Sequence, residues 1–213
     1  MVYEIVKYGD PVLRTKGRRV EEIDDNVRQL AADMLETMYA AHGLGLAAQQ
    51  IGLALQITVV DVAPVQENHP SEMLIDGKKV KLEDWMPMVL INPKLELDAD
   101  RDIASEGCLS FPEIHGDVTR ATAIKVKTQL LDGREMEFRA TGMLARAIQH
   151  ETDHLNGVLY IDRMSSAQKV SIGSRVKRLQ KEGLANPTQG KPRPAKHQPA
   201  KKPGPVAGET EEM

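Results

Sequence analysis

Cysteine, aromatic residues and long hydrophobic runs are all scarce in this chain of 213 residues, and the first and last of these scarcities each exclude a class of protein. The single cysteine, Cys108, excludes an internal disulfide and therefore a disulfide-stapled secreted fold. No hydrophobic run approaches the roughly 20 residues of a membrane span, and the N-terminus lacks the basic and apolar regions of a secretory signal. We therefore expect a cytoplasmic protein with no membrane partner.

Aromatic residues make up 3% of the chain, whereas hydrophobic residues make up 41% and charged residues 28%. The overall balance is that of an ordinary globular protein, so the low aromatic content predicts a mainly aliphatic core. The length suffices for one compact domain that buries its own core, with some residues to spare.

The formal net charge of -3 hides an uneven distribution along the chain. Between Arg175 and Lys202, nine residues are Lys or Arg and one, Glu182, is acidic, so the remainder of the chain is acidic. Residues 184–213 are rich in Pro, Lys, Gly and Gln and have no apolar periodicity. We interpret residues 1–183 as one folded domain and residues 184–213 as a disordered tail.

Apolar periodicity and turn residues predict short strands, hairpins and a few helices. Asp76-Gly77 and Asp132-Gly133 have the turn chemistry of hairpins, and the irregular stretch 63–87 is interpreted as a surface insertion. Strands joined by tight turns form antiparallel sheets, so the predicted fold class is α+β rather than alternating βαβ. The predicted elements are helices at 24–41, 142–155 and about 165–181, and strands at 56–62, 121–131 and 135–140.

His150 and His154 are four residues apart in the predicted helix 142–155, so their imidazoles project from one face and can share a cation. Glu151 lies on the neighbouring apolar stripe, where an unpaired carboxylate is costly. As a general base, it would accept a proton from a water whose pKa a metal has lowered. An ordinary amphipathic helix is the alternative interpretation.

A metal site needs a third ligand, and the longer zinc-protease pattern has Tyr160 where its third histidine would stand. His197 lies in the predicted tail, and Glu182 or Asp162 would need special placement. Cys108 is the better candidate, because a nearby cation stabilises the thiolate. For a lone cysteine, the alternative is a buried small hydrophobic residue.

Three segments of the sequence, Gly43–Gln50, Glu106–Ser110 and His150–Leu155, resemble the three ordered motifs of the peptide deformylase family. The resemblance extends over residues 1 to about 165. It implies mostly antiparallel sheets packed around a central metal-binding helix. It also implies a metal-dependent hydrolase that removes the formyl group from the N-terminal formylmethionine of newly synthesised proteins and releases formate.

Position by position, the resemblance implies that Cys108, His150 and His154 are the metal ligands and that Glu151 is the acid-base residue. It also implies that Gln50 and the backbone amide of Leu109 stabilise the oxyanion. The residues expected to bind substrate are Leu44, Gly45, Met143 and Ala147.

Three further charged residues, Glu106, Arg120 and Asp153, are candidates to orient the ligands, because ligating imidazoles usually donate their second N–H to a fixed acceptor. Surface ion pairing explains each of them equally well.

The resemblance also implies one divalent metal per chain, with Fe²⁺ as the native ion and Zn²⁺, Ni²⁺ or Co²⁺ as other occupants. N-formylmethionyl peptides of nascent chains are the expected partners of a monomeric protein, and no DNA partner is expected. The basic tail predicts salt-sensitive contact with the ribosome, against the simpler interpretation of a solvated charge run.

Two other function classes were weighed. A general zinc endopeptidase conflicts with Tyr160 and with the lack of a well-placed downstream ligand. A binding protein with a structural metal would have no use for Glu151 and Gln50.

Overall fold

Two antiparallel sheets and three helices make up the computed structural model, which describes residues 1–188 and 191–195. This confirms the predicted α+β class. The helices are α1 (Asp25–Ala40), α2 (Gly142–Leu155) and α3 (Ser166–Ala185). The strands are β1 (Gly45–Ala47), β2 (Ile57–Val60), β3 (Met73–Ile75), β4 (Lys78–Val80), β5 (Met88–Leu97), β6 (Arg101–Cys108), β7 (Phe111–Ala121), β8 (Ala123–Gln129) and β9 (Glu135–Thr141).

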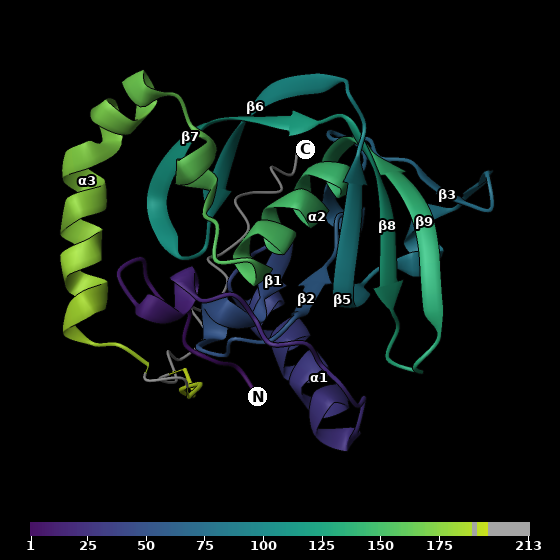
Figure 1. The fold of residues 1–213 in the computed structure, drawn as a ribbon, viewed down its shortest axis with the longest axis horizontal. Coiled ribbons are helices and arrows are strands. Elements are labelled where there is room, and N and C mark those ends of the chain that lie inside the picture. Colours follow the sequence, from purple (N-terminus) through teal and green to yellow (C-terminus); the bar gives the residue numbers. More distant parts are fainter. Residues whose placement is uncertain (189–190, 196–213) are drawn as a thin grey trace, which may run out of the picture.

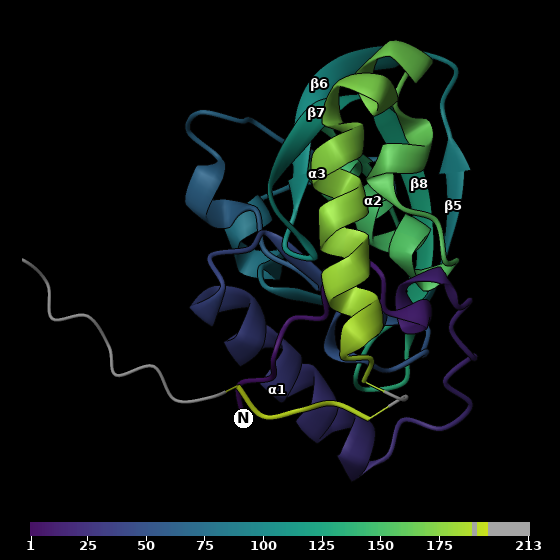
Figure 2. The ribbon, with the colours of Figure 1, turned by 90° about the vertical axis from the view of Figure 1, so that its left-hand side faces the viewer.

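The larger sheet has seven strands in the order β1-β2-β5-β8-β9-β3-β4, and every neighbouring pair is antiparallel. The smaller sheet is the two-stranded ribbon β6-β7. In Figure 1, α2 runs between this ribbon and the larger sheet. Figure 2 shows α3 lying across the outer face of the ribbon. Among the described residues, no helix is long and apolar enough to cross a membrane.

Local sequence signals set the ends of the helices. Asp24 caps α1 by accepting a hydrogen bond from the Val27 amide at 2.9 Å. Thr141 precedes α2 but does not cap it, because its hydroxyl accepts from the amide of Glu72. The cap comes from Ser71, whose hydroxyl accepts from the Leu144 amide at 2.9 Å, so a residue distant in sequence satisfies the helix end.

The interpretation of 63–87 as a surface insertion is wrong in part. Its hairpin turns at Asp76-Gly77 as predicted, but β3 then pairs with β9 and extends the larger sheet. Met73 is fully buried and Leu82 nearly so, both within the aliphatic core around α2. The stretch therefore covers one end of the core, a role that its irregular local pattern did not indicate.

The predicted start of disorder at Leu184 is also wrong for the described residues. Helix α3 continues to Ala185, and the amide of Thr188 donates to the carboxylate of Asp10 at 2.6 Å. Further on, the amide of Ala195 donates to the carbonyl of Val2 at 2.9 Å, beside the N-terminus. The rest of the predicted tail, 189–190 and 196–213, lies outside the described residues.

Candidate metal centre

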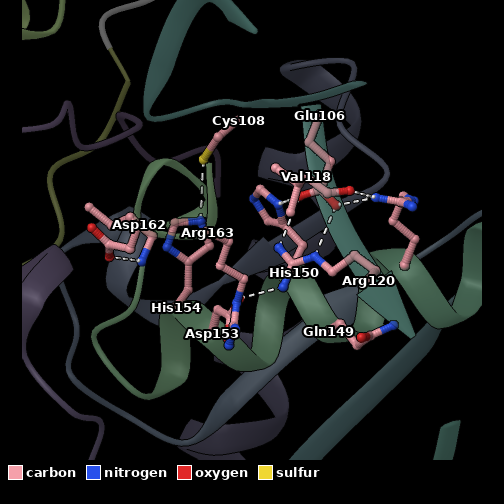
Figure 3. A network of polar contacts seen from close by, with 12 residues as sticks. Glu106, Cys108, Val118, Arg120, Gln149, His150, Asp153, His154, Asp162 and Arg163 are labelled. Carbon is pink, nitrogen blue, oxygen red and sulfur yellow. Dashed lines mark hydrogen bonds and ion pairs between the residues drawn. The ribbon is translucent and has the colours of Figure 1, made fainter. Parts of the chain in front are cut away.

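Helix α2 and the end of β6 bring three metal-ligating side chains together. His150 and His154, one turn apart on α2, are both buried, and their ring centroids are 5.1 Å apart. Cys108 ends β6, and its Sγ lies 3.2 Å from His154 Nε2 (Figure 3). One ligand atom from each of the three residues lies within 4.8 Å of the others. The structure thus brings together the three residues predicted as ligands.

The few aromatic residues hold the turn that carries Cys108. The Phe111 ring stacks on Tyr8 with centroids 4.7 Å apart and meets the edge of Tyr160 at 5.1 Å. The Tyr8 amide also donates to the Ser110 carbonyl at 3.0 Å. Tyr160, at the position of the third histidine of the protease pattern, is buried and donates its hydroxyl to the Ile114 carbonyl. Tyr160 therefore supports the site rather than binding a metal.

Glu106 orients His150 from behind. Glu106 Oε2 lies 2.9 Å from His150 Nδ1, which leaves the other ring nitrogen, Nε2, free for a cation. Arg120 donates to both oxygens of Glu106 at 2.9 Å. Burial acts to raise the pKa of Glu106, but the hydrogen bonds from His150 and Arg120 outweigh it and lower the pKa to about 2.

The network behind the ligands continues in two directions. Arg120 also pairs with Asp153, whose carboxylate accepts two further hydrogen bonds from Arg163 at 2.6 Å (Figure 3). Glu106, Arg120 and Asp153, which the sequence left open as surface ion pairs, are all buried. Sequence reasoning missed Arg163.

Arg146 was also missed by sequence reasoning, although it lies on the buried side of α2. It donates to Glu106 Oε1 at 2.8 Å and to Asp102 Oδ1 at 2.5 Å. A signal was available, because Arg146 lies one turn before His150 on the same face of the helix, where a buried arginine needs a partner.

Glu151 is 4% exposed, and its Oε2 atom is buried without a hydrogen-bond partner among the described residues. Burial raises the pKa of this carboxyl to about 7. A carboxyl group in such surroundings can take up and release a proton near neutral pH, which suits acid-base chemistry.

Gln50 points its amide nitrogen at Cys108. Its Oε1 accepts from the Ala47 amide at 2.9 Å, which fixes the side chain, and its Nε2 lies 3.4 Å from Cys108 Sγ. Leu109 follows Cys108 directly and lines the same cavity as Gln50. Both predicted oxyanion donors are therefore beside the ligand group.

A cavity of about 590 Å³ opens over these residues. All four residues predicted to bind substrate line it, together with Glu151 and most of the ligand group. Its lining also includes His42 and Glu113, which sequence reasoning did not assign to the site. The predicted residues in the lining are Leu44, Gly45, Gln50, Cys108, Leu109, Met143, Ala147, His150 and Glu151.

The donor set fits a divalent transition metal. One thiolate and two imidazoles suit zinc or ferrous iron, and three protein ligands leave a position for a water or substrate, as catalytic sites require. The Glu106 contact to His150 is the outer contact that metal-ligating histidines usually make.

Known proteins are similar to this chain in both sequence and fold. A family model described as polypeptide deformylase matches residues 2–170. Peptide deformylase from Opitutus terrae is 47% identical over 85% of this chain and 94% of its own length. The enzyme from Methylacidiphilum infernorum is 45% identical over 85% of this chain and 94% of its own length.

A solved structure agrees. The crystal structure of peptide deformylase from Thermotoga maritima is 41% identical, with a TM-score of 0.66, and the match covers 78% of this chain and 99% of that chain. With the ligand group, the carboxyl and the cavity in place, the chain belongs to the polypeptide deformylase family.

Proposed function

We propose that Glu151, Gln50 and the backbone amide of Leu109 carry out the hydrolysis that this family performs. That reaction removes the formyl group from the N-terminus of newly made proteins, and it is the function of this chain. The observation that carries the proposed roles is the placement of a buried, unpaired carboxyl, Glu151, on the same cavity as the three-ligand group.

Cys108, His150 and His154 would hold the cation. When bound, a divalent ion there supplies Lewis-acid chemistry, lowering the pKa of a water and polarising a carbonyl. Glu151 accepts a proton as the water attacks the formyl carbon and delivers it to the departing amine, so formate and a free amino terminus leave. Its pKa of about 7 suits both halves of this transfer.

The developing oxyanion would be stabilised by Gln50 and by the Leu109 backbone amide. Because the Ala47 amide holds Gln50 Oε1, the two N–H groups on Nε2 are already turned toward the ligand group. A donor that is fixed before reaction spends little free energy on reorientation in the transition state.

The substrate is proposed to lie along β1. This strand has a neighbour on one side only in the described sheet, so a peptide can add to its free edge and pair with Gly45. Backbone pairing tolerates many peptide sequences, as general processing of nascent chains requires. Leu44, Met143 and Ala147 form the half-buried apolar lining for the methionine side chain.

We also propose that the native metal is Fe²⁺, with Zn²⁺, Ni²⁺ or Co²⁺ able to replace it. The protein would act as a cytoplasmic monomer. Metal analysis of anaerobically purified protein tests whether the native metal is Fe²⁺, and light scattering tests the oligomeric state.

We also propose that the basic segment, residues 175–202, contacts the ribosome. Four of its nine cationic residues lie in α3, which is part of the fold. The helix is therefore tested by charge changes and the residues after it by truncation. A chain truncated after Ala195 keeps the described contacts with the N-terminus, whereas reversing charges on α3 tests the helix. Co-sedimentation with ribosomes across a salt series would show binding lost in one of these variants. If both variants bind ribosomes as strongly as the unmodified chain does, residues 175–202 do not make the contact.

The main experiment measures formate release from a formyl-methionyl peptide by iron-loaded protein prepared without oxygen. The same peptide without its formyl group serves as the control substrate for internal cleavage. We expect formate from the first peptide, no cleavage of the second, and a loss of about 10²–10⁴-fold in kcat for Glu151→Gln. Internal cleavage without formate would overturn the proposal.

A further inference from the structure

Gly45 lies against Glu151, and the side chain that Gly45 lacks determines where the Glu151 carboxylate rests. A Cβ atom at position 45 would lie 2.5 Å from Glu151 Oε1 and 2.8 Å from both Cδ and Cγ. Nonbonded carbon atoms prefer about 3.5–4.0 Å, so with a Cβ at position 45 either Glu151 or the strand would have to shift. Gly45 does not have a positive φ, so its backbone conformation does not require glycine. The requirement comes from the carboxylate.

Strand β1 cannot move away to make room. Gly45 is in register with Val60 of β2, and the Thr58 hydroxyl donates to the Leu46 carbonyl at 3.0 Å. The Ala47 amide is bonded to Gln50 as well. A methyl group at position 45 would therefore displace the end of the Glu151 side chain rather than the strand.

The Glu151 carboxylate lacks the hydrogen bonds that usually fix a buried acid. Oε2 has no partner among the described residues, in contrast to Glu106, which Arg120 and Arg146 hold from two sides. Shape then has to supply what hydrogen bonds do not. The backbone of Gly45 lies close enough to this carboxylate that even one added carbon at position 45 would meet it.

We infer that Gly45 is a positioning residue for Glu151, in addition to its proposed contact with substrate. The inference rests on the proposed acid-base role of Glu151. Gly45 allows the carboxylate to lie beside β1, at the edge where the substrate would be bound. Displacing the carboxylate by a fraction of an ångström to an ångström lengthens both proton transfers while leaving the apolar pocket intact.

The direct test compares Gly45→Ala with the unmodified protein, both loaded with iron. We expect kcat to fall by about 10- to 100-fold, the usual consequence of a misplacement near 1 Å. KM, metal content and the thermal midpoint should change little, because the apolar residues Leu44, Met143 and Ala147 and the ligand group are unchanged. A rise in KM with kcat retained would mean that Gly45 serves only substrate approach, and it would overturn the inference.

A double-mutant cycle with Glu151→Ala adds the readout that a merely structural role would not move. Alanine lacks the Cγ, Cδ and Oε1 atoms that a methyl at position 45 would meet, so Gly45→Ala has no carboxylate left to displace in the double variant. The double variant should therefore lose less activity than the product of the two single losses. Independent, multiplicative losses would contradict the inference.

Gly43→Ala is the matched control. A Cβ there would lie 2.8 Å from Leu109 Cδ1, the end of a flexible side chain, and does not meet Glu151. Its effect should be independent of Glu151→Ala.

A crystal structure of Gly45→Ala separates this inference from the proposed function. A displaced carboxylate supports the inference even if no formate is ever released, whereas an unmoved carboxylate overturns it even in an active enzyme.

Discussion

Glu106 is the residue on which the charges behind the metal ligands converge. It accepts hydrogen bonds from Arg120 and Arg146 and lies against His150. A single neutral substitution therefore tests whether the network supports both stability and the metal. Removing one partner of a buried pair leaves the others uncompensated, which is more costly than losing an exposed pair.

We predict that Glu106→Gln lowers the free energy of unfolding by about 3–5 kcal/mol. We also expect metal affinity to fall by about 10- to 100-fold, because His150 loses its charged acceptor. Urea unfolding and competitive metal titration measure the two effects. Glu137→Gln, which removes a carboxylate from exposed pairs with Lys125 and Lys127, should change neither. Equal effects in both variants would refute the role of Glu106.

The pKa of Glu106 predicts a pH dependence of stability. The folded-state pKa of about 2 lies below the ordinary value of 4.5, so folding favours the ionised form. This contribution is complete above pH 4.5 and is lost as the pH falls toward 2. Urea midpoints of the unmodified protein should fall across this window more steeply than those of Glu106→Gln. Parallel curves would contradict the prediction.

At the scale of elements, α3 packs against the N-terminal segment through two glycines, Gly9 and Gly183, where the two backbones are in close contact. A Cβ on Gly183 would lie 2.3 Å from the Tyr8 carbonyl oxygen, and one on Gly9 would lie 2.2 Å from the Gln180 carbonyl oxygen. Gly173, in the same helix, has nothing within 4 Å of its Cβ position. Gly173 and Gly183 both lie in α3, but the Cβ position of Gly183 meets backbone atoms and that of Gly173 meets nothing.

We predict that Gly183→Ala destabilises the docking of α3 by about 1–3 kcal/mol, because backbone atoms cannot move aside as side chains do. Gly173→Ala should instead stabilise the helix by roughly 0.5–1 kcal/mol. Amide hydrogen exchange across α3 and urea unfolding distinguish the two. A stabilising Gly183→Ala would show that the contact is not tight.

Elements with strong local signals could be predicted, and elements that depend on distant partners could not. Helix α2 spans the predicted 142–155, because its apolar stripe and the Asn156-Gly157 stop are local. The ribbon β6-β7 was missed, because β6 has no regular alternation of buried and exposed residues. The pairing of β3 with β9 joins residues about 65 positions apart, which no local pattern specifies.

The residues that would hold or face the metal could be predicted from the sequence, whereas the arginines behind them could not. Histidines spaced by four and a buried acid between them are visible in one helix, and the motifs around Cys108 and Gln50 supply the rest. Arg163 and Arg146 act through residues on other elements, so their partners emerge only from the folded chain.

At the scale of the whole molecule, the three proposed metal ligands come from the ribbon β6-β7 and from α2. Cys108 lies on one and the two histidines on the other, so a bound ion connects units that are separate in sequence. An ion that binds only the folded state raises stability by mass action.

We predict that chelation lowers the thermal midpoint. The loss corresponds to about 2.7 kcal/mol when the free ion had been present at 100 times its dissociation constant. Differential scanning calorimetry with and without added Fe²⁺ measures the shift. Cys108→Ala should show a much smaller dependence on added metal, and an equal dependence would place the ion elsewhere.

The free edge of β1 has a cost as well as a use. Unpaired backbone donors and acceptors on an edge strand can pair with a second copy of the chain as readily as with a peptide, which is a common start of aggregation. β1 is only three residues long, and short edge strands limit such pairing. Because the same hydrogen-bonding groups serve both events, a peptide bound along β1 would also protect the protein from self-association in concentrated solution.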